Sequence, residues 1–197
     1  MRKDVINLSI KLGCIFVLIT VLFATTYYQN AELAKELLEP YFETVEGFMT
    51  EEGGISFKEL WLNNLFACVK TIAMGTLPLV YLPIIALLSN ATVIGTVLGL
   101  TAAETQISLT NAILFMILPH GIFELPALFL SFGLGFYLCK WMTRRFFRKN
   151  LDDPRTFNEV MNSIAKGYVL VVVPLLTVAA LVECYVTPEI MAWAGLA

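Results

Sequence analysis

His120 lies four residues before Glu124 in the segment Leu118-Pro119-His120-Gly121-Ile122-Phe123-Glu124-Leu125-Pro126, and the sequence contains no other histidine. This segment interrupts an otherwise largely apolar stretch from Ile107 to Cys139. An imidazole and a carboxylate at bilayer depth are costly unless they pair or face a hydrated cavity, so a functional site is the default interpretation. A four-residue spacing places both side chains on one face of a helix. His120 and Glu124 are therefore the candidate catalytic residues, acting as acid and base or as metal ligands.

Two prolines frame this pair and predict an interruption of the helix. Pro119 suits the first turn of a helix, where its missing N–H donor is harmless. Pro126 removes a backbone hydrogen bond and bends a helix that continues towards Tyr137. The sequence therefore predicts a broken, kinked or re-entrant helix that carries His120 and Glu124, which lipid tolerates only where protein or water covers the freed backbone groups.

The composition is that of a polytopic membrane protein. The chain has 197 residues, of which 58% are hydrophobic, and a mean hydropathy of +0.76. Several apolar runs are long enough to enter a bilayer. We therefore predict an all-α fold, a polytopic membrane helix bundle that forms a single transmembrane domain over residues 1–197. The four cysteines lack the spacing of a metal or redox pair and are predicted to be buried hydrophobes; they are Cys14, Cys68, Cys139 and Cys184.

Charged residues are divided between two loops, and this division predicts the orientation in the membrane. Residues 29–59 contain eight Glu and two Lys, whereas residues 140–155 contain six Lys or Arg and two Asp. Because loops rich in Lys and Arg stay in the cytoplasm, we predict a cytoplasmic N-terminus, a cytoplasmic basic loop (140–162), an extracytoplasmic acidic loop (28–59) and an extracytoplasmic C-terminus. The acidic loop has apolar residues at helical spacing, which predicts either a lid over the outer mouth of the bundle or a docking surface for a partner.

This orientation requires an odd number of crossings between residues 60 and 140. Hydropathy offers four apolar segments there, with a turn predicted at Ser89-Asn90-Ala91-Thr92; they are 60–89, 91–103, 107–119 and 122–139. The second and third are too short to span a bilayer alone. Two arrangements satisfy the parity. One has three crossings and a re-entrant half-helix ending at Pro119-His120, and the other has one complete crossing between two hairpins that dip into the membrane.

Further polar residues within the apolar segments are candidates for binding a substrate or an ion. Lys70 is a candidate counter-charge to Glu124 or Glu104 inside the bundle. Asn64 and Asn90 interrupt apolar runs and complete this set. Two pairs of glycines predict close helix packing, within one chain or in a homodimer; they are Gly95 with Gly99 and Gly133 with Gly135.

The Pro-His-Gly-x-x-Glu-Leu-Pro motif of residues 119–126 belongs to a longer pattern that resembles the stage II sporulation protein M family over about residues 57–141. The pattern also includes Asn64, Gly75, Asn90, Gly95, Gly133 and Gly135. The family usually has glycine where this chain has Ala91. The resemblance implies a multi-pass membrane protein. The named member in sporulating bacteria looks like a membrane anchor for peptidoglycan-degrading partners during engulfment. Relatives also occur in organisms that form no spores and in gene clusters for circular bacteriocins.

Three functions remain open on the sequence. The first is a scaffold that recruits other membrane or envelope proteins at the cell membrane, in which His120 and Glu124 are structural. The second is a membrane-embedded peptide-processing enzyme that uses these two residues. One histidine and one carboxylate do not complete a zinc site, so Glu104, Glu183 or a symmetry mate would supply the rest. The third is a small transport or export component, since broken helices and intramembrane charges suit a substrate pathway.

The sequence also restricts the ligands and partners. We expect no cofactor, because no nucleotide-binding motif and no His-Glu-x-x-His pattern is present. The basic, aromatic run that begins at Lys140 directly follows a membrane span, so it indicates the inner lipid interface rather than a nucleic-acid partner. The expected partners are the lipid bilayer and other membrane or envelope proteins.

Overall fold

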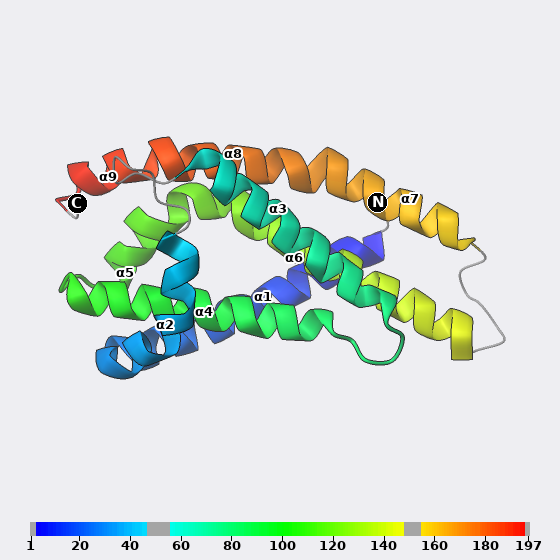
Figure 1. The fold of residues 1–197 in the computed structure, drawn as a ribbon, viewed down its shortest axis with the longest axis horizontal. Coiled ribbons are helices and arrows are strands. Elements are labelled where there is room, and N and C mark those ends of the chain that lie inside the picture. Colours follow the sequence, from blue (N-terminus) through cyan, green and yellow to red (C-terminus); the bar gives the residue numbers. More distant parts are fainter. Residues whose placement is uncertain (1–2, 47–55, 148–154, 196–197) are drawn as a thin grey trace.

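The fold is that of a computed structural model, which describes residues 3–46, 56–147 and 155–195. Regular structure in these residues is entirely helical, as Figure 1 shows. The elements are α1 (Lys3–Tyr28), α2 (Ala31–Glu46), α3 (Phe57–Ala73), η1 (Met74–Thr76), α4 (Pro83–Glu104), α5 (Leu109–Ala112), η2 (Ile113–Ile117), α6 (Leu118–Phe147), α7 (Phe157–Gly167), η3 (Tyr168–Val172), α8 (Val173–Tyr185) and α9 (Thr187–Trp193). The prediction of an all-α membrane helix bundle is confirmed.

Four helical stretches in the described part of the chain are long and apolar enough to cross a bilayer. They are Lys3–Tyr28, Pro83–Glu104, Leu109–Phe147 and Phe157–Trp193. α3 and the 3-10 turn η1 add a fifth, shorter segment to the same bundle. Large apolar side chains point outwards, including Leu18 and Leu170, which are 70% and 71% exposed. Such outward apolar surface is what a helix bundle presents to lipid.

Contacts between the segments show how the bundle is threaded. Ser9 contacts Gly133 and Gly13 contacts Phe129 between α1 and α6, and Thr20 contacts Gly95 and Ala24 contacts Gly99 between α1 and α4. α6 is therefore antiparallel to α1, and α4 is parallel to it. In Figure 1, α7 and the end of α6 lie at one end of the bundle, and α2, α5 and α9 lie at the other. Three segments, α3, α4 and α5–α6, connect residue 60 with residue 140, and the predicted re-entrant half-helix ending at Pro119-His120 is not confirmed.

Gly95 and Gly99 allow α4 to lie directly on the backbone of α1. A Cβ atom added to Gly95 would lie 2.5 Å from the carbonyl oxygen of Thr20, and one added to Gly99 would lie 2.5 Å from that of Ala24. A backbone carbonyl cannot swing aside as a flexible side chain can, so both positions require glycine at this helix separation. These two glycines thus pack against a helix of the same chain.

The predicted turn at Ser89-Asn90-Ala91-Thr92 is wrong. These residues lie inside α4, where the Asn90 side chain donates a hydrogen bond to the carbonyl of Ala86, one turn earlier. The chain reverses instead at residues 77–82, within the run that was expected to be one long segment. Leu79 and Tyr81 have positive φ values of 68° and 48° there. Pro83 then begins α4, because its missing N–H is harmless at the first helical position.

Proline also explains the two π-helical segments, η2 and η3. A proline at position i cannot donate to the carbonyl of residue i−4, and its ring clashes with that carbonyl. η2 contains Phe115, four residues before Pro119, and η3 contains Leu170, four residues before Pro174. A wider helical turn relieves both problems. Single π-helical turns are also frequent at functional sites, and η2 leads directly into the turn of α6 that carries His120.

A complete break of the helix at Pro119 or Pro126 is not confirmed. Residues Leu109–Phe147 form one helical stretch of 39 residues, and Pro126 lies inside α6. At 1.5 Å per residue this stretch would be about 58 Å long if it were straight, which exceeds the hydrocarbon thickness. Figure 1 shows that the ribbon instead changes direction between α5 and α6. The helix thus bends, as in the kinked alternative of the prediction, whereas a broken or re-entrant helix is not confirmed.

The acidic segment forms α2 as far as Glu46, and its part at residues 47–55 lies outside the described residues. α2 packs on α4 through Ala34 and Leu38, which are buried. Lys35 is 3.1 Å from Glu104 at the end of α4. The hydrogen bond to Glu104 raises the pKa of Lys35 above its usual value, and the nearby Glu32 adds to this effect. α2 is therefore tied to α4 on the side of the bundle.

Candidate functional site

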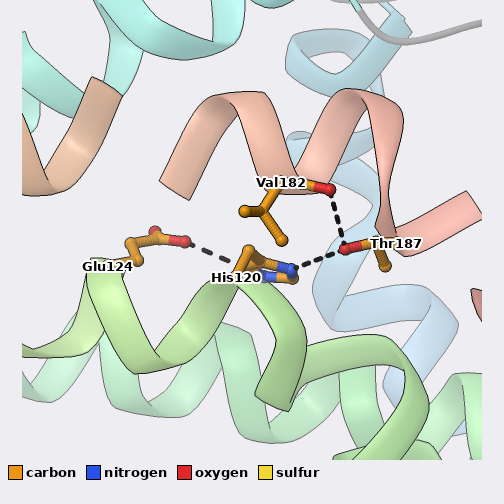
Figure 2. Close-up of polar contacts among 4 residues, drawn as sticks. All are labelled: His120, Glu124, Val182 and Thr187. Carbon is orange, nitrogen blue, oxygen red and sulfur yellow. Dashed lines mark hydrogen bonds and ion pairs between the residues drawn. The ribbon is translucent and has the colours of Figure 1, made fainter. Parts of the chain in front are cut away.

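Three titratable side chains from two helices meet inside the bundle. His120 and Glu124 lie one turn apart on α6, and His120 Nε2 is 3.8 Å from Glu124 Oε2. Figure 2 shows that these two side chains point along the same face of the helix. Glu183 approaches from α8, and one ligand atom from each of the three residues lies within 4.8 Å of the others. We call His120, Glu124 and Glu183 the acidic cluster.

Hydrogen bonds between α3 and the C-terminal helices hold Glu183 in this place. The Trp61 indole donates to the Thr177 hydroxyl over 3.0 Å, and the Tyr168 hydroxyl donates to the Leu65 carbonyl over 2.9 Å. Both bonds join residues that are more than 100 positions apart in sequence. Because α8 also packs along α6, its rotation about its own axis is fixed and Glu183 faces α6.

The surroundings of His120 favour one tautomer of its neutral imidazole. Thr187 lies at the junction of α8 and α9, and its hydroxyl donates to the carbonyl of Val182 over 3.2 Å (Figure 2). The hydroxyl oxygen is then an acceptor for His120 Nδ1, which is 3.5 Å away. A proton on Nδ1 leaves the lone pair on Nε2, the nitrogen that faces Glu124. His120 is therefore oriented to accept a proton or to bind a metal through Nε2.

The acidic cluster forms the polar corner of a cavity of about 340 Å³. His120 is buried and both carboxylates are partly buried. The cavity wall combines α1, α3, α4, η2, α6 and α8; its lining residues are Phe16, Val17, Thr20, Val21, Leu60, Asn64, Ile94, Leu98, Ile113, Ile117, His120, Gly121, Glu124, Leu125 and Glu183. Most of these side chains are apolar. The cavity thus suits a molecule that is largely apolar and has one polar end.

The acidic groups in this wall have no strongly basic counterpart. It contains two carboxylates but neither lysine nor arginine. In the described part of the chain, Glu124 faces His120, which would be an ion-pair partner only when protonated, and no hydrogen bond or ion pair joins Glu183 to another side chain. Charged groups at this depth require a partner. The arrangement can therefore hold a cation, pass a proton between its groups, or bind the polar end of a ligand.

The other candidate residues are distributed differently from the prediction. Asn64 lines the cavity near the acidic cluster. Asn90 is part of α4 and bonds within that helix, and Glu104 pairs with Lys35. The predicted pairing of Lys70 with Glu124 or Glu104 is not present among the described residues. Lys70 is exposed in the last turn of α3, which ends at Ala73.

Two residues of the site were not among the candidate site residues. Glu183 had been considered only as an additional metal ligand, although a carboxylate inside an apolar span was a usable signal. Thr187 had no distinctive sequence signal. It follows His120 by 67 positions, and only the packing of α8 and α9 against α6 brings the two together.

Comparison with known proteins places these features in one family. The sequence model described as Stage II sporulation protein M matches residues 11–188. An uncharacterized protein of Methanocaldococcus jannaschii, MJ0793, is 30% identical over 139 residues, which cover 68% of this chain and 72% of the relative. No solved structure matches the chain. The matched residues include the acidic cluster, Asn64 and the glycines of the helix contacts, and the chain belongs to the Stage II sporulation protein M family.

Proposed function

We propose that this protein binds an amphipathic, lipid-soluble molecule in the cavity beside the acidic cluster, and that its function is exercised there. The observation that carries the proposal is the position of two carboxylates and an imidazole at the corner of an apolar cavity of about 340 Å³. In a purely structural role, such groups are expected to be packed against partners that satisfy them. A space of this kind beside acidic groups without a strongly basic counterpart favours a ligand. Both the enzyme and the transport hypotheses need such a site.

The route into the cavity supports a ligand from the membrane. Val17, Val21 and Ile113 line the cavity, and each exposes a third or more of its surface. The cavity therefore opens between α1 and η2, on the side of the bundle and not at its end. In a bilayer this opening faces lipid. A molecule dissolved in the membrane would enter with its apolar body and place its polar end at the acidic cluster.

The charge distribution supports an orientation for this site. Basic residues lie at the end of α6, including Lys140, Arg144 and Arg145, whereas Glu104 and α2 lie near the opposite end. By the preference of Lys and Arg for the cytoplasmic side, the N-terminus is cytoplasmic and the C-terminus extracytoplasmic. The acidic cluster then lies towards the outer leaflet of the cell membrane.

Two tryptophan substitutions at adjacent apolar residues test this proposal, one that fills the cavity and one that does not. Ile113 lines the cavity, whereas Leu114 points elsewhere and is 45% exposed. Ile113→Trp is expected to reduce binding of a neutral monoacylglycerol by about tenfold or more, and Leu114→Trp is expected to leave it unchanged. Native mass spectrometry of the full chain, released from nanodiscs that contain the monoacylglycerol, measures the bound amount. Equal binding by the two variants would contradict the proposal.

A second candidate function, a scaffold that recruits membrane or envelope proteins, is favoured by one surface of α2. Leu33, Leu37 and Tyr41 recur every four residues and are 49%, 46% and 41% exposed. On the adjacent face of the same helix, Ala34 and Leu38 are buried in the contact with α4. An exposed apolar stripe with this spacing, flanked by glutamates, is typical of a helix that docks into a groove of another protein.

Photo-crosslinking in cells tests the scaffold function. A photoreactive residue in place of Leu37 is expected to give discrete adducts with another protein. The same residue in place of Leu22, which is 60% exposed on α1, is expected to react with lipid alone. Leu33→Ser, with the crosslinker kept at position 37, is expected to reduce the protein adducts. Lipid adducts alone at position 37 would mean that the stripe faces the membrane, and would remove this candidate function.

A further inference from the structure

The acidic cluster has the composition and spacing of a metal site. His120 and Glu124 are separated by four residues, the spacing at which a single helix presents two ligands on one face. Glu183 adds a third ligand from a second helix. We propose that His120 Nε2, Glu124 and Glu183 bind one divalent transition-metal ion, for which Zn²⁺ is the probe. This inference deepens the function proposed above at the same cavity.

The distances are compatible with one shared ion. Zinc bonds to nitrogen and oxygen are about 2.0–2.2 Å long, so two ligand atoms at tetrahedral angles are about 3.4 Å apart. The observed separations are 3.8 Å between His120 and Glu124, and at most 4.8 Å within the trio. Rotation of the two glutamate side chains can close a difference of this size, because neither carboxylate is fixed by a hydrogen bond to another side chain in the described residues.

The second coordination layer is already in place around His120. Histidines that bind metal usually donate their other ring N–H to a nearby oxygen, which fixes the tautomer and the ring orientation. Here Thr187 provides that oxygen at Nδ1, and its own proton is used by the carbonyl of Val182. The lone pair of Nε2 therefore points towards the carboxylates.

A divalent ion would also match the charge of the two glutamates in their ionised form. The cavity wall carries two carboxylates and no lysine or arginine. One ion of charge +2 neutralises both without a further side chain. A site with three protein ligands keeps a coordination position open, and at this place the open position faces the apolar cavity. An oxygen atom at the polar end of the bound amphiphile would be its natural fourth ligand.

The test uses the complete chain in nanodiscs, purified without a histidine tag, stripped with a chelator and reloaded with Zn²⁺. Elemental analysis is expected to find one tightly held zinc ion per chain. Replacing any ligand, in the variants His120→Ala, Glu124→Gln and Glu183→Gln, should lower zinc affinity by about tenfold or more. Thr187→Val should weaken it by about 10–100-fold through the second layer. Glu189→Gln, a matched loss of one exposed carboxylate on α9, should leave it unchanged.

X-ray absorption on the zinc-loaded wild-type protein gives a measurement that does not depend on folding of the variants. His120 is the only histidine of the chain, so an imidazole in the zinc coordination shell identifies this site. The inference would be overturned by the absence of stoichiometric zinc or by the absence of an imidazole ligand. It would also be overturned if Glu189→Gln lost as much zinc affinity as the ligand variants. If the protein binds the monoacylglycerol but does not bind zinc, the metal site is wrong and the proposed function stands. If it binds zinc but does not bind the monoacylglycerol, the metal site stands and the proposed function is wrong.

Discussion

Glu183→Gln is expected to weaken ligand binding in the cavity and, in chelator-treated protein, to leave thermal stability unchanged or raise it. The substitution removes one of two carboxylates that lie close together in an apolar wall without a lysine or arginine. Like charges at short distance destabilise the folded state, and glutamine keeps the size of the side chain. Residues that are arranged for ligand binding commonly reduce the stability of the folded protein. Retention of the monoacylglycerol should fall by about tenfold or more, as measured by native mass spectrometry beside a thermal unfolding curve.

The same variant separates the cavity function from a purely structural role. If the acidic cluster only held the bundle together, removing one member would strand the others and cost about 3–5 kcal/mol, as for a broken buried ion pair. Glu183→Gln would then lower the unfolding temperature and reduce the amount of protein in the membrane. Glu104→Gln is the control, because it removes a carboxylate that pairs with the exposed Lys35 outside the cavity. A large loss of stability in Glu183→Gln alone would contradict the cavity function.

The double substitution Gly95→Ala and Gly99→Ala is expected to have the largest effect on stability. Each added Cβ would lie 2.5 Å from a carbonyl oxygen of α1, so the two helices must move apart along their whole contact. Inserting an extra methyl group into a packed interior typically costs about 1–3 kcal/mol per site. The lining residues Val17 and Thr20 belong to α1, and Ile94 and Leu98 belong to α4. The cavity should therefore lose its shape together with the helix contact.

Gly121→Ala provides the matched control in α6. The atoms nearest to a Cβ at Gly121 are side-chain methyl carbons, Cγ2 of Ile117 at 3.3 Å and Cδ1 of Leu125 at 3.8 Å, and neither is a backbone atom. Replacing glycine by alanine within a helix otherwise raises the free energy of unfolding by about 1 kcal/mol. Thermal unfolding in nanodiscs should therefore show a lower transition for the double variant and an equal or higher one for Gly121→Ala. Equal transitions for the two would show that α1 and α4 are not in the close contact described above.

The sequence by itself determined the class of the protein and the local part of its site. The amount and distribution of apolar residues already required membrane helices. The spacing of His120 and Glu124 already placed them on one face, because neighbours in a helix are related by backbone geometry alone. The proline positions indicated distortions near Pro119, although the structure has a π-helical segment and a bend there instead of a break.

Only the tertiary structure decided which distant residues meet this pair. Whether Lys70, Glu104 or Glu183 faces Glu124 depends on where each helix ends and how it is rotated. Those properties result from many weak contacts summed over the bundle, such as the bond from Trp61 to Thr177. Lys70 lies on an exposed side of the last turn of α3, and the packing of α8 on α6 brings in Glu183. The cavity has the same origin, since no single helix encodes the space left between several.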